Sequence, residues 1–167
     1  MLIGIGGVSR SGKSTLAEQL FAEATQQKRQ ACILHQDTFV LSAEKLPRIR
    51  DHIDWEVPGS MDWKRLEGRV RAACAKNDIV ILEGLFAFAY EAINRQYQRS
   101  ICMHISRSVF WQRKSTDLRW GREPDWYMEH IWQSFLRYGQ PPAHLYPITH
   151  IDGTVPVPVG IVRALLR

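Results

Sequence analysis

The sequence lacks an apolar run long enough to cross a membrane, since none approaches the roughly 18 residues that a spanning helix requires. No basic segment precedes the first apolar run, so we expect no signal peptide. The cysteines are few, odd in number and free of any C-x-x-C spacing, which argues against a disulfide framework and a redox motif; they are Cys32, Cys74 and Cys102. We therefore expect a cytoplasmic protein whose reduced cysteines lie in its core.

The sequence also lacks a basic tract, an internal repeat and a low-complexity segment, although its 167 residues carry a net charge of +5. Because the basic residues are dispersed, we expect a small phosphate-bearing ligand and neither nucleic acid nor membrane as partner. The six histidines show no spacing typical of a metal site. The length fits one domain, residues 1–167, and nothing in the sequence indicates an oligomeric state.

What the sequence does contain is a series of short apolar runs that alternate with helical patterns. The runs are Leu2–Ile5, Ala31–His35, Asp78–Leu82, Ile101–Ile105 and the neighbourhood of His150–Ile151. Alternating strands and helices predict an α/β fold with a parallel sheet covered on both faces. In such a sheet, ligands bind beyond the carboxyl ends of the strands.

Helical patterns fill most of the intervals between these runs. A first helix, after Lys13, is expected to bury Leu16, Ala17, Leu20, Phe21 and Ala24. Asp62 can cap a second helix, and either Ser106 or Ser108 can begin a third. Asp125 begins a fourth helix that we expect to end at Gly139, ahead of two prolines.

The segment after the first run has the G-x-x-x-x-G-K-[ST] pattern of a phosphate-binding loop. Its glycines let successive backbone N–H groups point at one phosphate, while the lysine reaches the β- and γ-phosphates and the serine ligates Mg²⁺. The predicted ATP contacts are Gly7, Ser9, Arg10, Ser11, Gly12, Lys13, Ser14 and Thr15. The alternative is a glycine-rich turn with a solvated lysine. No D-x-x-G or N-K-x-D string of a GTPase occurs, which leaves a small kinase as the leading class.

An acid follows each of the next two runs, Asp37 within H-Q-D-T-F and Glu83 within I-L-E-G. Phosphoryl transfer needs a carboxylate that orients the acceptor hydroxyl and takes its proton. It also needs oxygen ligands around Mg²⁺. Asp37 fits the first role and Glu83 the second, but the two roles are interchangeable at this point, so both acids join Ser14 as candidate metal ligands. The alternative for each is a solvated or helix-capping acid.

Six segments occur in the order G-G-V-S-R-S-G-K-S-T, H-Q-D-T-F, D-W-E-V-P-G-S-M-D-W, I-L-E-G-L-F, R-K-S-T and H-I-D-G-T. Together they resemble the nicotinamide riboside kinases, relatives of uridine-cytidine kinase among the P-loop nucleoside kinases. The resemblance implies ATP-dependent phosphorylation of the ribose 5′-hydroxyl of nicotinamide riboside, which gives the mononucleotide in NAD salvage. It also implies a five-stranded parallel sheet and a small lid at roughly residues 113–127.

The resemblance places the acceptor nucleoside at the D-W-E segment. Glu56 stands where the family has a carboxylate, usually aspartate, that grips the ribose 2′- and 3′-hydroxyls, and Trp55 stands where an aromatic ring stacks on the nicotinamide. This pairing is physically reasonable, because the pyridinium is a cation and an indole face attracts cations. We expect Trp120 to cover the other face of the pyridinium, with Trp126 and Tyr127 as alternatives.

The lid segment contributes cations that can stabilise the charge of the transition state and exclude water. Arg113 and Arg119 are the first candidates, followed by Arg122. Lys114 stands where the family tends to have an arginine that contacts the ribose, so a point charge replaces a planar fork. The alternative is a solvated, basic helix end. Further along, the H-I-D-G-T segment is expected to form a loop against the adenine, with Asp152 as a nucleotide contact.

Two other functions stay open. A uridine or cytidine kinase would need polar groups that read the edge of the base. A non-catalytic nucleotide-binding module would lack the acceptor-site acids, which this sequence retains.

Overall fold

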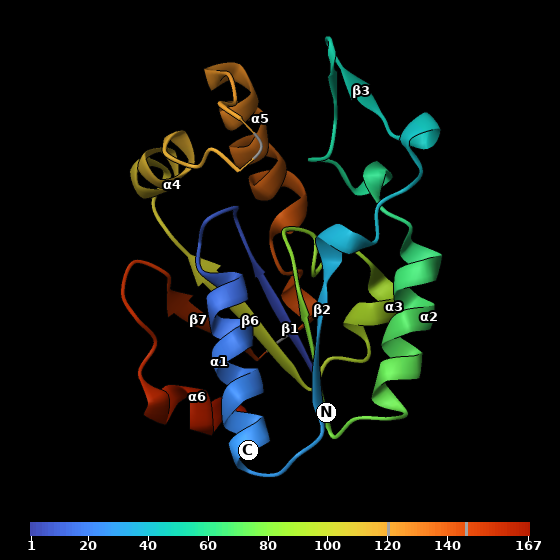
Figure 1. Ribbon diagram of the computed structural model, residues 1–167, viewed down its shortest axis with the longest axis vertical. Helices are drawn as coiled ribbons and strands as arrows, with labels where there is room; N and C mark the ends of the chain where they lie inside the picture. Colours follow the sequence, from blue (N-terminus) through green and yellow to red (C-terminus); the bar gives the residue numbers. More distant parts are fainter. Residues whose placement is uncertain (120, 146) are drawn as a thin grey trace.

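The computed structural model describes residues 1–119, 121–145 and 147–167 and contains a five-stranded sheet in the order β2-β5-β1-β6-β7 (Figure 1). The strands are β1 (Leu2–Gly7), β2 (Ala31–His35), β5 (Ile79–Glu83), β6 (Arg99–His104) and β7 (Ile148–Asp152). All neighbouring pairs in this sheet are parallel. The predicted α/β fold with five parallel strands is therefore confirmed.

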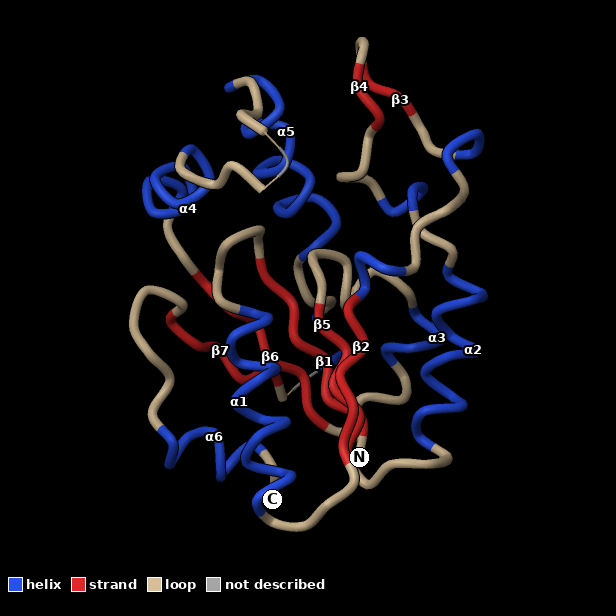
Figure 2. Tube along the Cα trace, in the orientation of Figure 1, coloured by secondary structure: helices blue, strands red, loops and turns tan. Residues whose placement is uncertain are grey.

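Helices cover both faces of the sheet, as Figure 2 shows. On one face, α1 (Lys13–Gln26) and α6 (Val159–Leu165) pack on a core that includes Ile3, Ile5, Leu16 and Leu20. The second core, on the opposite face, takes residues from α2 (Trp63–Cys74), α3 (Glu91–Asn94), α4 (Arg107–Ser115) and α5 (Asp125–Ser134). Because side chains alternate along a strand, the residues of β1 supply both cores.

The remaining elements are short. A two-stranded antiparallel hairpin is formed by β3 (Arg48–Ile49) and β4 (His52–Ile53). Single helical turns lie at Gln36–Thr38, Ala43–Lys45, Pro58–Ser60 and Ala143–Leu145, and a π-helical turn, Phe135–Gly139, extends α5. The sequence analysis had placed the end of that helix at Gly139, which is where the extension ends.

Two helices begin at the capping residues that the sequence offered. The Asp62 carboxylate accepts a hydrogen bond from the Arg65 backbone N–H at 3.1 Å. The Ser106 hydroxyl accepts one from the Val109 N–H at 3.3 Å, so Ser106 rather than Ser108 begins α4. Each cap satisfies a backbone donor that the first turn of the helix leaves unpaired.

Two burial predictions were wrong. Phe21 is 38% exposed, because the buried stripe of α1 runs through Leu16, Leu20 and Ala24 and leaves Phe21 at its edge. Cys74 is exposed as the last residue of α2, and Cys32 is half-buried, so Cys102 is the one cysteine that lies fully in the core.

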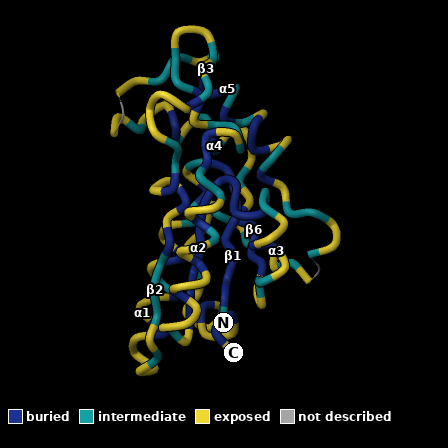
Figure 3. Tube along the Cα trace, turned by 90° about the vertical axis from the view of Figure 1, so that its right-hand side faces the viewer, coloured by how far each residue is buried: buried dark blue, intermediate teal, exposed yellow. Residues whose placement is uncertain are grey.

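The functional end of the molecule is set by the direction of the strands. In Figure 1 the β1–α1 loop, α4, the start of α5 and the β3–β4 hairpin all lie beyond the carboxyl ends of the strands, and the two chain ends lie at the opposite end. Figure 3 shows β1 and β6 as buried strands between helices whose outer faces are exposed, whereas the edge strand β2 is mostly half-buried. Across the three described ranges, no helix combines the length and the apolar character that crossing a membrane demands.

Substitution of Gly4 tests the packing of β1. A Cβ atom at Gly4 would lie 2.5 Å from the ring of Tyr97, whose hydroxyl donates a hydrogen bond to the Ala87 carbonyl at 2.7 Å. We expect Gly4→Ala to lower the free energy of unfolding by about 1–3 kcal/mol, because the rigid ring must shift. Urea denaturation measures this change.

Gly68→Ala is the matched control. Gly68 lies within α2, and a Cβ there would meet no atom within 4 Å. The substitution should raise the free energy of unfolding by about 0.5–1 kcal/mol, since alanine restricts the unfolded chain. Equal effects of the two substitutions would contradict the packing described here.

Candidate active site

The phosphate-binding loop connects β1 to α1. Gly7 ends the strand, Ser9, Arg10, Ser11 and Gly12 form the loop, and Lys13, Ser14 and Thr15 make the first turn of the helix. Gly12 adopts the left-handed conformation with φ 96°, and Arg10 does so with φ 64°. Such conformations turn successive backbone N–H groups toward one point and create an anion-binding concavity. The Lys13 ammonium donates a hydrogen bond to the Val8 carbonyl at 3.0 Å, so its charge lies over the same loop.

Glu83 ends β5 and lies beside this loop. One of its carboxylate oxygens accepts a hydrogen bond from the Ser14 hydroxyl at 3.2 Å and lies 2.8 Å from Nδ1 of His35. The Glu83 residue is only 4% exposed. A hydroxyl and a carboxylate at the start of a phosphate-binding helix are oxygen donors of the kind that Mg²⁺ prefers, so the residues present fit this ion.

His35 is a site residue that the sequence analysis missed. It lies directly opposite Glu83 in the parallel pairing of β2 with β5. His35 ends one predicted strand and Glu83 directly follows another, but the sequence does not reveal the strand order that makes the two residues neighbours. The imidazole contacts the same carboxylate oxygen as the Ser14 hydroxyl and so helps to hold the carboxylate in place.

Asp37 lies in the helical turn that follows β2. Desolvation by the surrounding protein raises the pKa of its carboxyl, the Lys13 ammonium lowers it and the Glu83 carboxylate raises it. Asp37 nevertheless remains accessible to solvent. It therefore combines proximity to the phosphate-binding lysine with access for a second ligand.

Residues 54–56, which we call the acceptor segment after the predicted role of D-W-E, are held in place by the side chain of Asp54. This buried carboxylate accepts a hydrogen bond from the Glu56 backbone N–H at 3.0 Å and lies 2.8 Å from Nε2 of His130 on α5. The Ser60 hydroxyl supports the same segment by donating to the Trp55 carbonyl at 3.1 Å. The Trp55 residue is 44% exposed, which leaves its ring available to a ligand.

Glu56 faces Asp37 across the site. Burial and, to a smaller extent, the Asp37 carboxylate raise the pKa of Glu56 to about 7, against the opposing effect of the Lys114 ammonium. Lys114 is almost fully buried, and its ammonium lies 3.0 Å from a carboxylate oxygen of Glu123. Glu123 is a second residue that the sequence analysis missed. Its pairing ties the start of α5 to the end of α4 beside the acceptor segment.

The predicted lid arginines are held by contacts within the protein. The Arg113 guanidinium donates to the Arg10 carbonyl at 3.1 Å and to the Gly153 carbonyl at 2.9 Å. Arg119 donates to both carboxylate oxygens of Asp117, through Nε at 2.8 Å and a terminal nitrogen at 2.7 Å.

Asp117 also lies 3.7 Å from the Arg10 guanidinium, so two contacts connect the lid segment to the phosphate-binding loop. Arg122 is exposed.

A cavity of about 310 Å³ lies between the first turn of α1 and the segment after β7; its lining includes Gly12, Thr15, Arg113, Gly153 and Val157. The prediction that residues 150–154 form a loop was wrong in part, because His150–Asp152 complete β7 through pairing with β6. The turn begins after Asp152, whose carboxylate accepts from the Thr154 N–H at 2.8 Å. Gly153 then packs against the loop so closely that a Cβ would lie 2.1 Å from the Ser11 carbonyl oxygen.

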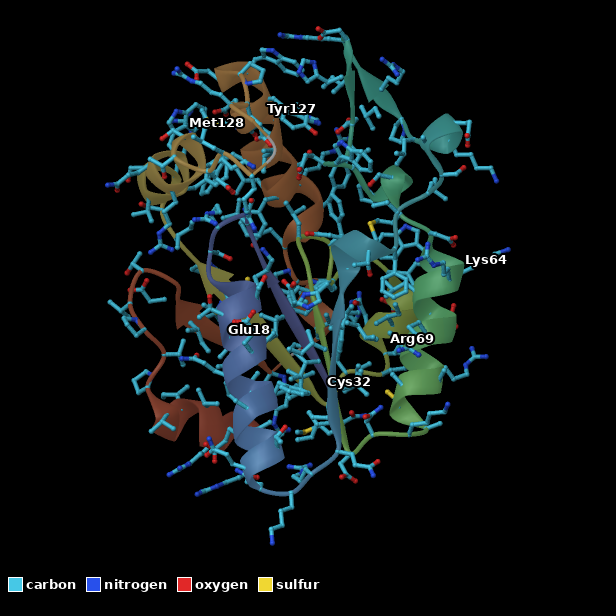
Figure 4. The ribbon with its side chains drawn as sticks, in the orientation of Figure 1. Glu18, Cys32, Lys64, Arg69, Tyr127 and Met128 are labelled. Atoms are coloured by element: carbon cyan, nitrogen blue, oxygen red, sulfur yellow. The ribbon has the colours of Figure 1, made fainter. Side chains whose placement is uncertain are left out.

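The aromatic residues predicted to cover the second face of the pyridinium differ in how far they are free to contact a ligand. Trp120 lies outside the residues that the structure describes. Tyr127 is 5% exposed and donates from its hydroxyl to the Ile53 carbonyl at 3.4 Å. Trp126 packs edge-on against the His52 ring, at 5.0 Å between centroids. Both residues thus join α5 to the β3–β4 hairpin, and Figure 4 labels Tyr127 at this end of the molecule.

Comparison with known proteins supports the resemblance inferred from the motifs. The chain is 22% identical to nicotinamide riboside kinase 2 of Homo sapiens, over 92% of this chain and 74% of that protein. It is 28% identical to nicotinamide riboside kinase 1 of Rattus norvegicus, over 92% of this chain and 86% of that protein. A uridine kinase of Mycoplasma genitalium is also 28% identical, over 57% of this chain and 56% of that protein. No family model matches the chain.

Solved structures with the same fold are P-loop kinases. A gluconokinase from Sinorhizobium meliloti aligns with a TM-score of 0.57 and 16% identity, over 99% of this chain and 87% of that chain. A possible uridine kinase from Bacillus stearothermophilus aligns with a TM-score of 0.58 and 17% identity, over 89% of this chain and 88% of that one. The chain therefore has the P-loop kinase fold.

The raised pKa of Glu56 predicts a specific pH dependence of stability. The folded protein keeps the Glu56 proton up to about pH 7, whereas the ordinary pKa of a glutamate carboxyl is 4.5. Between these values the folded state binds more protons than the unfolded state, so Glu56 makes the free energy of unfolding fall as the pH rises. Glu56→Gln removes this fall. The variant should gain roughly 1–3 kcal/mol relative to the wild type between pH 4.5 and about pH 8.

Urea denaturation of both proteins at pH 4.5 and at about pH 8 measures this gain in the free energy of unfolding. Glu18→Gln, on the exposed face of α1, controls for the loss of one carboxyl at the protein surface. A difference between wild type and Glu56→Gln that does not change with pH would contradict the description of Glu56.

Proposed function

We propose that the protein is a nucleoside kinase that transfers the γ-phosphoryl group of ATP to the 5′-hydroxyl of a ribonucleoside, and that nicotinamide riboside is its preferred acceptor. The observation that carries the proposal is the position of Asp37. Its carboxyl is influenced by Lys13 on the donor side, and it influences Glu56 on the acceptor side. Transfer of a phosphoryl group requires that the donor and acceptor sides adjoin, and Asp37 lies near residues of both.

On the donor side, the loop amides and Lys13 bind the phosphates, and the cavity between α1 and the segment after β7 accepts the base. Ser14 and Glu83 would hold Mg²⁺, which neutralises charge on the transferred group. The buried hydrogen bonds of Glu83 favour it as the metal-side acid. This leaves Asp37 as the base, although the sequence allowed either assignment.

On the acceptor side, Glu56 accepts hydrogen bonds from the ribose 2′- and 3′-hydroxyls, and Lys114 with Glu123 holds the wall behind it. The 5′-hydroxyl then points toward Asp37, which accepts its proton as the oxygen bonds to the γ-phosphorus. The bond from that phosphorus to the bridging oxygen of ADP breaks in the same step. The accessible carboxyl of Asp37, with a pKa raised by its surroundings, suits this transfer.

The lid proposal assigns Arg113 and Arg119 to the transferred phosphoryl group. Both guanidinium groups lie on the segment that Arg113 and Asp117 connect to the phosphate-binding loop. Their present partners are carbonyl oxygens and one carboxylate, and the charged oxygens of a polyphosphate are alternative acceptors for arginine. Release of these contacts on nucleotide binding would let the segment close over the donor.

The choice of nicotinamide riboside depends on Trp55 and on the acids beside it. The exposed indole of Trp55 offers a face to a pyridinium cation, and a bound cation would favour the ionised form of the nearby carboxyls of Glu56 and Asp37. A uridine or cytidine kinase is the second candidate, supported by the similarity to a uridine kinase. The base of those nucleosides carries no positive charge, so it gains less from this surface.

A coupled assay of ADP formation with each nucleoside tests the proposed function. We expect nicotinamide riboside to exceed uridine and cytidine in kcat/KM by about tenfold or more, as a cation–π contact of up to ~2 kcal/mol would give. Faster turnover of uridine than of nicotinamide riboside would show that the proposed acceptor is wrong, although the protein would still be a nucleoside kinase. ATP binding without phosphorylation of any nucleoside would instead identify a non-catalytic module and reject the proposal.

The role of Asp37 is tested by Asp37→Asn, which keeps the size of the side chain and removes its capacity to accept a proton. We expect kcat to fall on the order of 10²–10⁴-fold while the dissociation constant for ATP stays within about twofold. Single-turnover kinetics and calorimetry measure the two quantities. Asp51→Asn, an exposed carboxyl in the β3–β4 turn, is the matched control. Turnover by Asp37→Asn at the wild-type rate would show that another group takes the proton.

A further inference from the structure

Three side chains outside the candidate active site come together at the edge of the sheet. Cys102 and His104 on β6 and His150 on β7 each offer one ligand atom, and these atoms all lie within 4.8 Å of one another. We propose that this cluster binds a borderline-soft divalent metal ion such as Zn²⁺. Spacing along the chain does not reveal this cluster, because the third ligand lies 46 positions after the second.

Strand register brings the three side chains to one face of the sheet. Cys102 and His104 are two residues apart on β6, so their side chains point the same way. The parallel pairing of β6 with β7 sets Cys102 opposite His150. The cluster therefore rests on backbone hydrogen bonds of the main sheet rather than on a loop, which is the kind of support that a preformed metal site needs.

The two imidazoles direct one ring nitrogen each toward the other, close to the arrangement that a shared ion requires. Nε2 of His104 and Nδ1 of His150 lie 2.5 Å apart, with the ring centroids at 4.7 Å. Two nitrogens bound to one tetrahedral zinc at about 2.0–2.1 Å would be roughly 3.3 Å apart. Both rings reach solvent, so a small rotation of each ring can move the two nitrogens apart to the distance that zinc requires.

Access and ligand type also fit an ion of this class. A cavity of about 390 Å³ opens beside His104 and His150, while Cys102 is completely buried and closes the site from within. Because a thiol coordinates as the thiolate, the incoming ion must displace the Cys102 proton, which leaves to solvent.

The protein provides three ligands from these residues, and water can complete the coordination. Asp152 lines the same cavity, but one of its carboxylate oxygens already accepts hydrogen bonds from the Thr154 N–H and hydroxyl. Sulfur and imidazole ligands favour zinc-like ions over Mg²⁺, which prefers oxygen. The cluster is thus chemically distinct from the proposed magnesium site at Ser14 and Glu83, and its test does not depend on the proposed kinase activity.

Titration of the full-length protein with Co²⁺ tests the site by absorption spectroscopy. We expect a thiolate-to-cobalt charge-transfer band and the visible bands of a tetrahedral ion, both removed by Zn²⁺ and unaffected by excess Mg²⁺. His150→Ala and His104→Ala should each weaken Co²⁺ binding at least about tenfold. Cys102→Ser should abolish the charge-transfer band.

Cys74→Ser and His144→Ala are the matched controls, because they change an exposed thiol and an exposed imidazole away from the cluster. Both should bind Co²⁺ as the wild type does. The proposal is overturned if the wild type gives no charge-transfer band, if Cys74→Ser removes it, or if His150→Ala and His104→Ala bind Co²⁺ as tightly as the wild type. Should Cys102→Ser fail to fold, the two histidine variants at the protein surface decide the question.

Discussion

The parallel order β2-β5-β1 brings three strand ends side by side, and the hydrogen-bonded carboxylate of Glu83 joins them. Glu83, at the end of β5, contacts His35 from β2 and Ser14 from the helix that follows β1. The donor side of the candidate site depends on this junction, because it fixes the start of α1 relative to the turn that carries Asp37. The backbone pairing of β1 with β5 and of β5 with β2 supports the same arrangement.

The acceptor side depends on a second junction, between the segment around Asp54 and helix α5. His130, Tyr127 and Trp126 fasten this segment and the β3–β4 hairpin to the helix. The segment therefore presents Glu56 and an exposed Trp55 at the same end of the sheet as the phosphate-binding loop. Lys13 lies near the proposed donor side and several carboxyl groups lie near the proposed acceptor side, a distribution that suits the proposed transfer from a polyphosphate to a cationic nucleoside.

Local sequence patterns predicted the strands, the phosphate-binding loop and the helix caps, because each depends on residues close together in the chain. The contacts of His35 with Glu83, of Glu123 with Lys114 and of Cys102 with His150 were missed, since they arise from strand order and helix packing. Phe21 and Cys74 show the same limit: periodicity found the helices but not the edges of their buried stripes.

The central claim is that Asp37 lies between a phosphate donor and a nucleoside hydroxyl. A crystal structure with a non-hydrolysable ATP analogue and nicotinamide riboside tests it most directly. We expect the 5′-oxygen of the nucleoside to lie within about 2.6–3.2 Å of the Asp37 carboxylate and to face the γ-phosphate. A nucleoside bound away from Asp37, or with its 5′-hydroxyl directed away from the analogue, would contradict the account.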